Sequence, residues 1–513
     1  AALSRLQSNP DSENPFVLLK CPWCNAKFGP MPDESSRQRG RGRGQRSPLS
    51  VLGYTKYLLA GRTAETVVFR CNDQKCEFGY TIARPDSSPL PICIIDEDIF
   101  EAPPNLIIGT VDKFAMLAWK PEARTMFGIG KDGKHTGLPP TLIIQDELHL
   151  ISGPLGSMVG AYETIVEEMC TRRSHDSVLR PKIVASTATI SRAEEQVKAL
   201  YARDRVMLFP PSGLEAGDSF FAREARSGDG TLKPGRLYTG IMAPGHGSLQ
   251  TTLARVYAAL LQYPAIMPVL RGDESERDPW WTLLSFFNSL RELGGAATLL
   301  VADARDYLRV IIDRHGFSYS QIRQLLNVEE LTSRIRSDKI PLAIQKLEIP
   351  FGRDGRGYVK DTVEACLASN IIEVGVDIDR LSLMTIVGQP KTTSQYIQVS
   401  SRIGRSQERP GLVVVAYSQS KPRDRSHYER FRSYHQRLYA QVEPTSVTPF
   451  SPPAVDRALH GIIVATVRQL SPLAEARNPR PYPLENGSAL RSLVENMIEQ
   501  RITAVDPAER SNV

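Results

Sequence analysis

The sequence predicts an α/β protein with two parallel sheets flanked by helices. Short runs of branched apolar residues, typical of strands buried on both faces, recur along the chain, and helical patterns separate several of them. The runs lie in two groups, at about residues 141–189 and 280–416. Many of them end in acids, hydroxyls or amides, and the carboxyl ends of strands are where open α/β sheets place their chemistry. We therefore expect two domains, each with polar side chains at one edge of its sheet.

Composition sets broad bounds on class and partners. The chain has 513 residues, enough for two or more domains, and its 41% hydrophobic and 23% charged residues are typical of a soluble globular protein. Its apolar runs are too short to span a membrane, so we expect no membrane partner. The net charge of +6 neither requires nor excludes nucleic acid. The chain begins Ala1-Ala2-Leu3 without an initiator methionine, and we expect it to be part of a longer protein.

Four of the seven cysteines form two close pairs, Cys21 with Cys24 and Cys71 with Cys76. Each pair can supply two thiolates from one tight turn, and two such knuckles satisfy the tetrahedral geometry that zinc prefers. Protein would fill all four ligand positions, so the expected Zn²⁺ is structural. Metal binding would stabilise this insert, at about residues 20–82, by roughly 10 kcal/mol or more. A redox pair or unrelated buried thiols are the alternatives.

Between the cysteine pairs, residues 37–46 hold five arginines and three glycines. Such a segment cannot bury side chains, and we expect a loop. It would either contact phosphates, which makes binding salt-dependent, or remain an idle solvated loop. If it lies in the path of a bound strand, it would inhibit binding.

The acid pair after the strand Thr141–Gln145 is the centre of the predicted site. Asp146 and Glu147 follow this apolar run directly, and His149 lies two residues further on. Two adjacent carboxylates at the end of a buried strand need something to offset their desolvation, and Mg²⁺ with a nucleotide phosphate does so. Asp146 would hold the metal, and Glu147 would orient and deprotonate the attacking water. A strand with an acidic exit loop would show the same pair without any function.

A second apolar run, residues 181–186, ends in hydroxyls. It leads to Thr187, Ala188 and Thr189. Paired with His149, this hydroxyl cluster could relay the state of a nucleotide's γ-phosphate to a bound strand. A strand end followed by a capped helix is the alternative.

An earlier short run ends near Thr110 and Lys113, at the expected start of a helix. A hydroxyl, a lysine and the amides of a helix N-terminus suit a contact with a sugar-phosphate backbone. A simple helix cap would look the same.

The sequence contains one near match to a phosphate-binding loop, Gly128–Lys134. His135 stands where that pattern needs a serine or threonine for magnesium, and no buried strand precedes it. The segment also lies too close to the strand before Asp146 to open a helix. We interpret it as a turn, so the main cradle for a nucleotide's phosphates is absent from this sequence.

The second group of strands also delivers polar residues and a glycine. These residues are Asn288 and Ser289 after the run 280–287, then Ser369, Asn370, Gly375 and Asp377 after the run 363–368. Two arginines, Arg402 and Arg405, lie three apart on one helical face between two strands. An ordinary surface helix could carry them, but this is the position for an arginine finger, which is worth about 10³ to 10⁵ in phosphoryl-transfer rate.

Four of these segments together resemble motifs II, III, V and VI of the superfamily 2 helicases, in the same order and at similar spacing. The resemblance is carried by Asp146-Glu147-Leu148-His149, Thr187-Ala188-Thr189, Ser369-Asn370 with Gly375 and Asp377, and Gln398 with Arg402-Ile403-Gly404-Arg405. It implies two RecA-like domains with ATP and Mg²⁺ in the cleft between them and a nucleic-acid strand across their tops. His149 and Gln398 would then join the catalytic set.

The same resemblance implies where the strand and the nucleotide bind. The nucleic-acid contacts would be Thr110, Lys113, Asn288, Ser289, Thr332, Ser333, Ser369 and Asn370. The nucleotide contacts would be Asp146, Glu147, Gly375, Asp377, Arg402 and Arg405.

More narrowly, three stretches resemble the helicase subunit of the DISARM phage-defence system. They are Thr110–Phe114, Asp146–Gly156 and Ser446–Ser451, and the cysteine-rich insert fits that family too. The resemblance implies a bacterial, cytoplasmic protein that binds DNA with a single-stranded part and works beside a second defence subunit. Two departures stand out: motif I is missing, which puts ATP turnover by this chain alone in doubt, and Val399 and Ser401 occupy positions where many relatives carry arginine and glycine.

We expect the following domains: 1–210, a first RecA-like domain that lacks motif I; 211–265, a linker; 266–420, a second RecA-like domain; and 421–513, a basic and helical extension. Basic and aromatic residues are interspersed from Lys421 to Tyr434. This pattern suits either stacking on single-stranded nucleic acid or a helix with one packed aromatic face.

The sequence thus predicts an ATP-driven DNA helicase or translocase. The alternative is a nucleic-acid-binding scaffold subunit that keeps the fold without hydrolysis, although a scaffold needs neither the acid pair nor the arginine pair. A metal-dependent nuclease is a weaker alternative, because no second cluster of acids or histidines accompanies Asp146 and Glu147.

Overall fold

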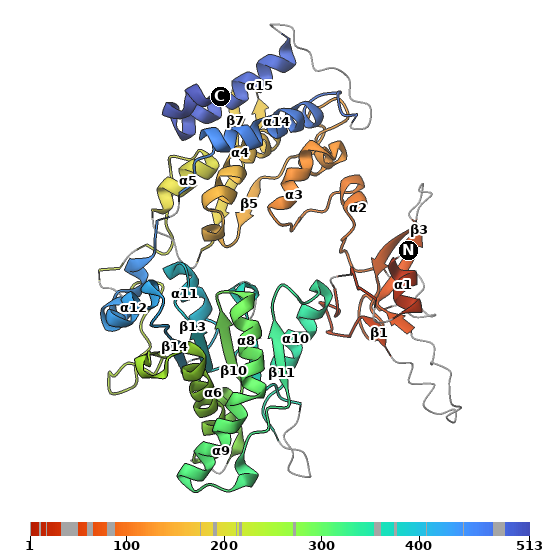
Figure 1. Cartoon of the computed structure of the whole chain (residues 1–513). Coiled ribbons are helices and arrows are strands. Elements are labelled where there is room, and N and C mark those ends of the chain that lie inside the picture. Colours follow the sequence, from red (N-terminus) through yellow and green to blue (C-terminus); the bar gives the residue numbers. More distant parts are fainter. Residues whose placement is uncertain are drawn as a thin grey trace. The chain divides into compact units, whose positions relative to one another are not determined.

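The computed structural model divides the chain into two compact units (Figure 1). It describes residues 2–9, 12–16, 18–31, 50–58, 65–79, 88–174, 176–187, 192–211, 213–214, 218–269, 273–352, 361–373, 377–406, 408–444, 446–475 and 488–513. Unit 1 contains Ala1–Thr187, Arg192–Val206 and Thr445–Val513, and unit 2 contains Ala188–Ser191 and Met207–Pro444. The arginine-rich segment 37–46 and the residues Ala188, Thr189 and Gly375 lie outside the described residues.

Unit 2 is built on a six-stranded parallel sheet. Its strands are β9 (Arg236–Ile241), β10 (Leu283–Phe287), β11 (Val328–Leu331), β12 (Ala365–Ala368), β13 (Leu383–Val387) and β14 (Gly411–Ala416), in the spatial order β11-β12-β10-β13-β14-β9. Every residue of β10, β12 and β13 is buried, as expected for strands that are covered on both faces. The predicted α/β class is confirmed.

Alternate residues of β10 enter two separate cores, because side chains of a strand alternate between its faces. Leu284 and Phe286 join one core, and Leu283 and Phe287 join the other. The first core includes residues of α10 (Ile340–Leu347) and α11 (Thr393–Ser400), and the second those of α6 (Leu249–Ile266), α8 (Leu290–Val301) and α9 (Asp303–His315). Burial of each large apolar side chain contributes about 1.5–3 kcal/mol, so unit 2 has a core of its own on each face of the sheet.

The expected linker, residues 211–265, contributes an edge strand and a helix to unit 2. β9 pairs in parallel with β14, and α6 packs into the core that contains Leu283. The strand was missed because glycine and proline surround it, at Pro234, Gly235 and Pro244, and such residues usually mark loops.

Unit 1 packs helices beside two parallel strands, β5 (Leu142–Gln145) and β8 (Lys182–Ala185). Its longer helices are α4 (Gly153–Cys170), α5 (Ala193–Tyr201), α14 (Pro452–Gln469) and α15 (Ala489–Val505). The last two helices share a core with α4 that includes Ala161, Ile462 and Ile498 (Figure 1). The expected extension 421–513 is therefore divided: its residues up to Pro444 belong to unit 2 and the rest to unit 1.

The strand before the acid pair is exposed, and the prediction that it is buried on both faces was wrong. Leu142 is 49% exposed and Ile144 is 64% exposed, while Val184 on β8 is 44% exposed. Burial of a strand depends on its neighbours, and within the described residues β5 pairs with β8 alone. A branched apolar run predicts the strand, but it cannot tell whether this chain supplies what covers it.

A small module of short strands precedes these elements in unit 1. It contains the antiparallel pairs β1 (Gly29–Met31) with β2 (Ser50–Leu52) and β3 (Tyr54–Leu58) with β4 (Glu65–Phe69). The ring of Tyr54 contacts those of Phe16, Phe28 and Phe69 in its core. Cys21, Cys71 and Cys76 belong to the same core, so the cysteines and the aromatic residues hold this module together.

The remaining elements are short. They are α1 (Ala2–Ser8), α2 (Asp96–Glu101), α3 (Asp112–Ala115), β6 (Arg172–Ser174), β7 (Ser177–Leu179), α7 (Asp278–Trp281), α12 (Pro422–Glu429) and α13 (Phe431–Gln436). Among the helices in the described ranges, none is both long and apolar enough to cross a bilayer.

A buried ion pair ties α7 to the turn before β13. Arg380 and Asp278 lie 3.0 Å apart, and less than 10% of either side chain is exposed. Arg380 also donates to the carbonyl of Leu347 and to the hydroxyl of Thr282. Burial lowers the pKa of Arg380, and the nearby Asp278 carboxylate opposes that shift.

We expect Arg380→Met to destabilise unit 2 by about 3–5 kcal/mol, because the substitution leaves the Asp278 carboxylate buried without its cation. Chemical denaturation of the purified protein measures this change. Arg309→Met is the control: Arg309 is exposed, and its substitution should cost less than about 0.5 kcal/mol. Equal effects of the two substitutions would contradict the importance of the buried pair.

Candidate functional site

The acid pair is held by the strand next to it. β5 and β8 end in register, with Gln145 opposite Ala185, so Asp146 and Ser186 leave the sheet side by side. The Ser186 hydroxyl and the Glu147 amide both donate to the same oxygen of Asp146, Oδ1. The other oxygen, Oδ2, has no protein partner in the described part of the chain and is available to a ligand. An exposed carboxylate with one oxygen fixed and one open is a suitable ligand for Mg²⁺.

Glu147 adopts a left-handed backbone conformation, with φ 51° and ψ 48°, which is uncommon outside glycine. This turn lets the chain continue into a short helical segment whose Leu148 amide donates to the carbonyl of Ser186, 2.9 Å away. The Glu147 side chain remains 30% exposed. The turn thus separates the two acids: Asp146 is tied to the neighbouring strand, and Glu147 projects partly into solvent.

The predicted contact between His149 and the hydroxyl cluster is present. The His149 imidazole is buried, with Nδ1 3.1 Å from the Thr187 hydroxyl and 3.4 Å from Oε2 of Glu147. His149 therefore touches both the acid pair and the end of β8. A change at Glu147 can reach Thr187 through a single side chain.

The chain beyond the acids is fixed by buried hydrogen bonds. The amide of Gln196, on α5, donates to the carbonyls of Leu148 and Ile151, at 3.1 and 2.8 Å. Gly153 donates its N–H to Ser446, and a side chain at Gly156 would meet Ile151 O at 2.8 Å and Val447 at 2.9 Å. Two of the three stretches that resemble the DISARM helicase subunit, 146–156 and 446–451, are therefore in contact.

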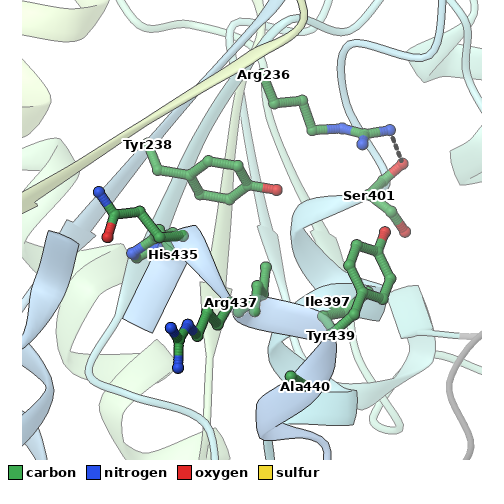
Figure 2. A pocket seen from close by; sticks show the side chains of 10 residues that line it. Arg236, Tyr238, Ile397, Ser401, His435, Arg437, Tyr439 and Ala440 are labelled. Atoms are coloured by element: carbon green, nitrogen blue, oxygen red, sulfur yellow. Dashed lines mark hydrogen bonds between the residues drawn. The ribbon is translucent and has the colours of Figure 1, made fainter. Parts of the chain in front are cut away.

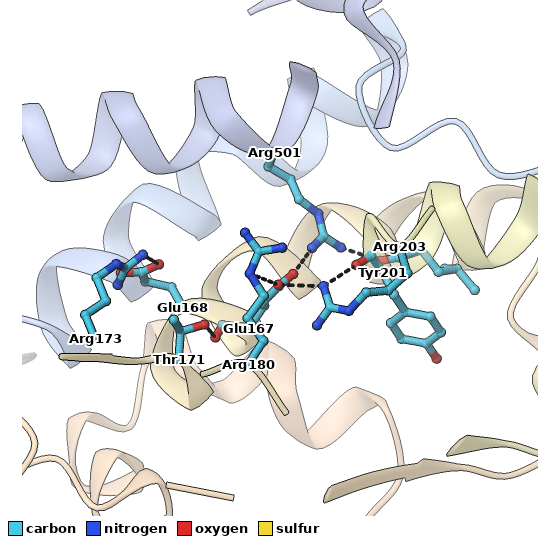
Figure 3. A network of polar contacts seen from close by, with 9 residues as sticks. Glu167, Glu168, Thr171, Arg173, Arg180, Tyr201, Arg203 and Arg501 are labelled. Carbon is cyan, nitrogen blue, oxygen red and sulfur yellow. Dashed lines mark hydrogen bonds and ion pairs between the residues drawn. The ribbon is translucent and has the colours of Figure 1, made fainter. Parts of the chain in front are cut away.

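Polar contacts join α4, α5 and α15 (Figure 3). The Glu167 carboxylate on α4 pairs with Arg180, Arg203 and Arg501. Arg501 comes from α15, and it also donates to the carbonyl of Leu200 at the end of α5. Burial lowers the pKa of Arg501, and Glu167 opposes the shift. The C-terminal helix thereby holds the two helices that follow the acid pair and the hydroxyl cluster.

In the N-terminal half of unit 1, both predicted strand contacts are exposed. Thr110 is exposed, and Lys113 lies in the four-residue helix α3. Its ammonium pairs with Asp96 on α2 at 2.8 Å. An exposed ion pair contributes little, about 0–1 kcal/mol, so a phosphate could replace Asp96 as the partner of Lys113.

Unit 2 gathers its candidate residues at one edge of the sheet. Thr332, Ser369 and Asn288 follow β11, β12 and β10, which are adjacent and parallel. Ser333, Ser289 and Asn370 are the exposed members of this edge. Thr332 and Ser369 are buried, so their side chains lie within the fold and not at its surface.

Two of these residues also have structural roles. Ser289 caps α8, because its hydroxyl accepts from the amide of Glu292. The Asn288 amide donates to the carbonyls of Val387 and Gly388, at 3.1 and 3.3 Å, and so fixes the exit of β13. A nucleic-acid contact by Asn288 remains a prediction, and the same side chain also has this structural role.

The predicted motif V and motif VI residues meet within unit 2. Arg405 forms an ion pair with Asp377 and donates to the carbonyl of Ser401. Gln398 and Arg402 are buried beside this turn. Gly404 has φ 58°, and a side chain there would lie 2.6 Å from the Gly411 amide, so the turn between the two arginines requires glycine.

A cavity of about 380 Å³ lies behind the same turn (Figure 2). Arg236 from β9 lines it and donates to the carbonyls of Ile403 and Ser401, at 2.7 and 3.3 Å. His435, on the opposite wall, has a pKa lowered by burial. This cavity was not predicted because its lining residues span just over 200 positions, from Arg236 to Ala440, and no motif connects them.

The four predicted cysteine ligands converge in the N-terminal module. Their sulfur atoms all lie within 4.8 Å of one another, and the Cys21–Cys76 and Cys24–Cys71 pairs are 3.9 and 3.4 Å apart. Sulfur atoms around a tetrahedral zinc, each at about 2.3 Å, are about 3.8 Å apart. The cluster therefore fits Zn²⁺, and with four thiolates it leaves no open position for a substrate.

Comparison with known proteins shows which proteins the chain resembles. Residues 352–407 match the helicase conserved C-terminal domain. The fold comparison gives the DUF1998 helicase MrfA bound to DNA and AMPPNP, at 14% identity and a TM-score of 0.46, covering 74% of this chain and 43% of that one. It also gives the Mycobacterium smegmatis helicase Lhr bound to ssDNA and AMP-PNP, at 16% identity and a TM-score of 0.44, covering 78% and 42%. The matched domain and the ordered motifs confirm the resemblance to superfamily 2 helicases.

The chain is also similar to one particular bacterial protein. The chain is 40% identical over 468 residues to the DISARM protein DrmA of Bacillus paralicheniformis. The match covers 85% of this chain and 39% of the relative, so the chain spans well under half of that protein. The resemblance to the DISARM helicase subunit, predicted from three stretches, is thus confirmed over most of the chain.

We expect the purified protein to contain one zinc ion, and Cys71→Ser to lose it and unfold the N-terminal module. Metal analysis and limited proteolysis measure the two effects. Cys93→Ser is the control, because Cys93 is exposed and lies outside the cluster. Full zinc content in the Cys71 variant would contradict the four-thiolate site.

Proposed function

We propose that the whole protein is an ATP-dependent DNA helicase or translocase of superfamily 2 that acts in bacterial anti-phage defence. The observation that carries this proposal is the contact chain from Asp146 through Glu147 and His149 to Thr187. A nuclease or a passive scaffold has no use for an acid pair that is linked by one buried imidazole to the end of the next strand.

In this proposal each residue of the chain has a distinct task. Asp146 holds Mg²⁺ through its open oxygen, while Ser186 keeps the carboxylate oriented. Bound Mg²⁺ and ATP supply the charge and the reacting phosphate. Glu147 accepts the proton of the attacking water, a role that suits its partly exposed side chain. Arg402 and Arg405 are the source of positive charge for the transition state.

The phosphate-binding loop would come from another part of the whole protein. The described residues contain no such loop, and the match to DrmA covers only 39% of that relative. The exposed branched side chains of β5 and β8 support this view, because a two-stranded parallel sheet is not stable alone and usually continues into further strands. ATP turnover is therefore proposed for the whole protein.

The nucleic-acid track would run over the polar edge of unit 2. Ser289, Ser333 and Asn370 are exposed there, next to the ends of three adjacent strands. Hydroxyl and amide groups at a sheet edge suit contacts with a sugar-phosphate backbone. Thr110 and Lys113 of unit 1 are proposed as further contacts with the nucleic-acid backbone. A second defence subunit is the proposed protein partner, and the bacterial cytoplasm the proposed location.

The alternative is a scaffold subunit that binds nucleic acid without hydrolysing ATP. The absence of a phosphate loop from the described residues favours it, and the intact pairs Asp146 with Glu147 and Arg402 with Arg405 oppose it. Measured hydrolysis decides between the two.

We expect Glu147→Gln to abolish ATP hydrolysis stimulated by single-stranded DNA, by at least about 100-fold, while ATP binding persists, because the variant removes only the base. Turnover and nucleotide binding by the whole protein are the measurements. Glu163→Gln, 16 residues further along the chain in α4, is the control and should retain turnover. No hydrolysis in the wild type, with normal DNA binding, would establish the scaffold.

We expect Thr187→Val to reduce the stimulation of ATP hydrolysis by DNA about tenfold and to change unstimulated hydrolysis little. The variant keeps the shape of the side chain and removes the hydroxyl that contacts His149. Hydrolysis with and without single-stranded DNA measures the ratio, and Thr171→Val serves as control at the far end of α4. An unchanged ratio would mean that this contact does not carry the signal.

A further inference from the structure

The segment Lys421–Arg437 of unit 2 carries six basic residues within 17 positions, and the predicted nucleotide and strand motifs include none of them. Five of them are the exposed arginines Arg423, Arg425, Arg430, Arg432 and Arg437. Their guanidinium groups have no acidic partner within the described residues. Lys421 differs, because its ammonium pairs with Glu292. Glu429 is the one exposed acid in the segment, so the surface is strongly positive.

Two aromatic residues of the same segment, Phe431 and Tyr434, face the protein interior, whereas Tyr428 is 38% exposed with its ring 5.9 Å from that of Tyr417. The ring of Phe431 packs between Tyr417 and His435, with ring centroids 6.3 and 4.0 Å away. Tyr434 is buried, and its hydroxyl donates to Thr393. The sequence left open whether these rings stack on bases or pack inward, and the structure shows that Phe431 and Tyr434 pack inward. The surface therefore offers five exposed guanidinium groups and one exposed ring, Tyr428.

A buried carboxylate fixes this segment to the polar edge of the sheet. Asp424 is 1% exposed and accepts from the amides of Gln389 and Ser418, at 3.0 and 2.8 Å. A side chain built at Gly388 would lie 3.3 Å from the Asp424 carboxylate and 3.6 Å from the Asn288 amide. Asn288 and the base of α12 are thus immediate neighbours, and the arginines continue from the edge on which the nucleic-acid track is proposed.

We propose that the exposed arginines of α12 and α13 form a second nucleic-acid contact, which holds the sugar-phosphate backbone of DNA beyond the Asn288 edge and reads no bases. This inference rests on the proposed DNA-binding function. Guanidinium groups without internal partners are free to pair with phosphates, and each pairing releases counterions from the DNA. Contacts between guanidinium groups and phosphates carry no sequence information, so binding by these arginines is independent of base identity.

The double variant Arg425→Gln with Arg432→Gln tests the proposal in the whole protein. Single-stranded DNA binding, measured without nucleotide at several salt concentrations, should weaken roughly three- to tenfold at low salt. The slope of log K against log salt should become shallower by about 1.4, because two phosphate contacts are lost at about 0.7 each. The loss should be the same on an oligonucleotide with abasic sites.

Two further variants make the result decisive. Arg309→Gln with Arg314→Gln removes the same charge from exposed positions of α9 and should leave the slope unchanged. Glu429→Gln removes the one exposed acid and should tighten binding, which a folding defect cannot do.

An unchanged slope in the Arg425 and Arg432 variant, with normal binding by the wild type, would overturn this inference and leave the proposed function intact. An equal loss in the α9 control would also overturn it, because the effect would then follow net charge and not position. A wild-type protein that binds no DNA would overturn both proposals.

Discussion

The parallel pairing of β5 with β8 is the interaction on which the candidate site depends. Its register carries Asp146 and Ser186 off the sheet together, so the Ser186 hydroxyl donates to the carboxylate of Asp146 and fixes it. A slip of one residue would turn Asp146 to the other face and separate the two groups. The left-handed backbone of Glu147 then brings His149 back beneath the end of β8. Backbone pairing, and not side-chain packing, therefore sets the distances of the acid site.

The elements behind this site come from distant parts of the chain. Arg501 reaches Glu167 and Leu200 from a helix some 300 residues further on, and Ser446 accepts from Gly153. These contacts fix the start of α4 and the end of α5, the helices that follow the two motifs. Because interior contacts are closely packed and resist continuous deformation, a shift at His149 would be transmitted to whole helices. This arrangement gives the C-terminal helices a role in holding the site without any direct contact with its acids.

Local features of the sequence predicted the parts of the structure that local chemistry decides. The cysteine spacing predicted the thiolate cluster, and the apolar runs located β10, β12, β13 and β14. Features that depend on distant neighbours were not predicted. They are the exposure of Ile144, the edge strand β9 among glycine and proline residues, and the packing of α15 against α4. The basic and aromatic segment after residue 420 was ambiguous for the same reason, since only packing decides which way Phe431 points.

The two units differ in how complete they are, and this difference bears on how the whole protein works. Unit 2 buries its central strands on both faces and needs no further residues to form a core. Unit 1 leaves Leu142 and Ile144 exposed on the strand that precedes Asp146 and Glu147. Covering such side chains stabilises a fold by about 25 cal/mol for each Å² of apolar surface removed from water. If further strands of the whole protein provide that cover, the segment that brings the phosphate loop also stabilises the strand that carries the acids. Nucleotide binding and the integrity of the acid site would then depend on the same packing, whereas the polar sheet edge of unit 2 would remain folded without it.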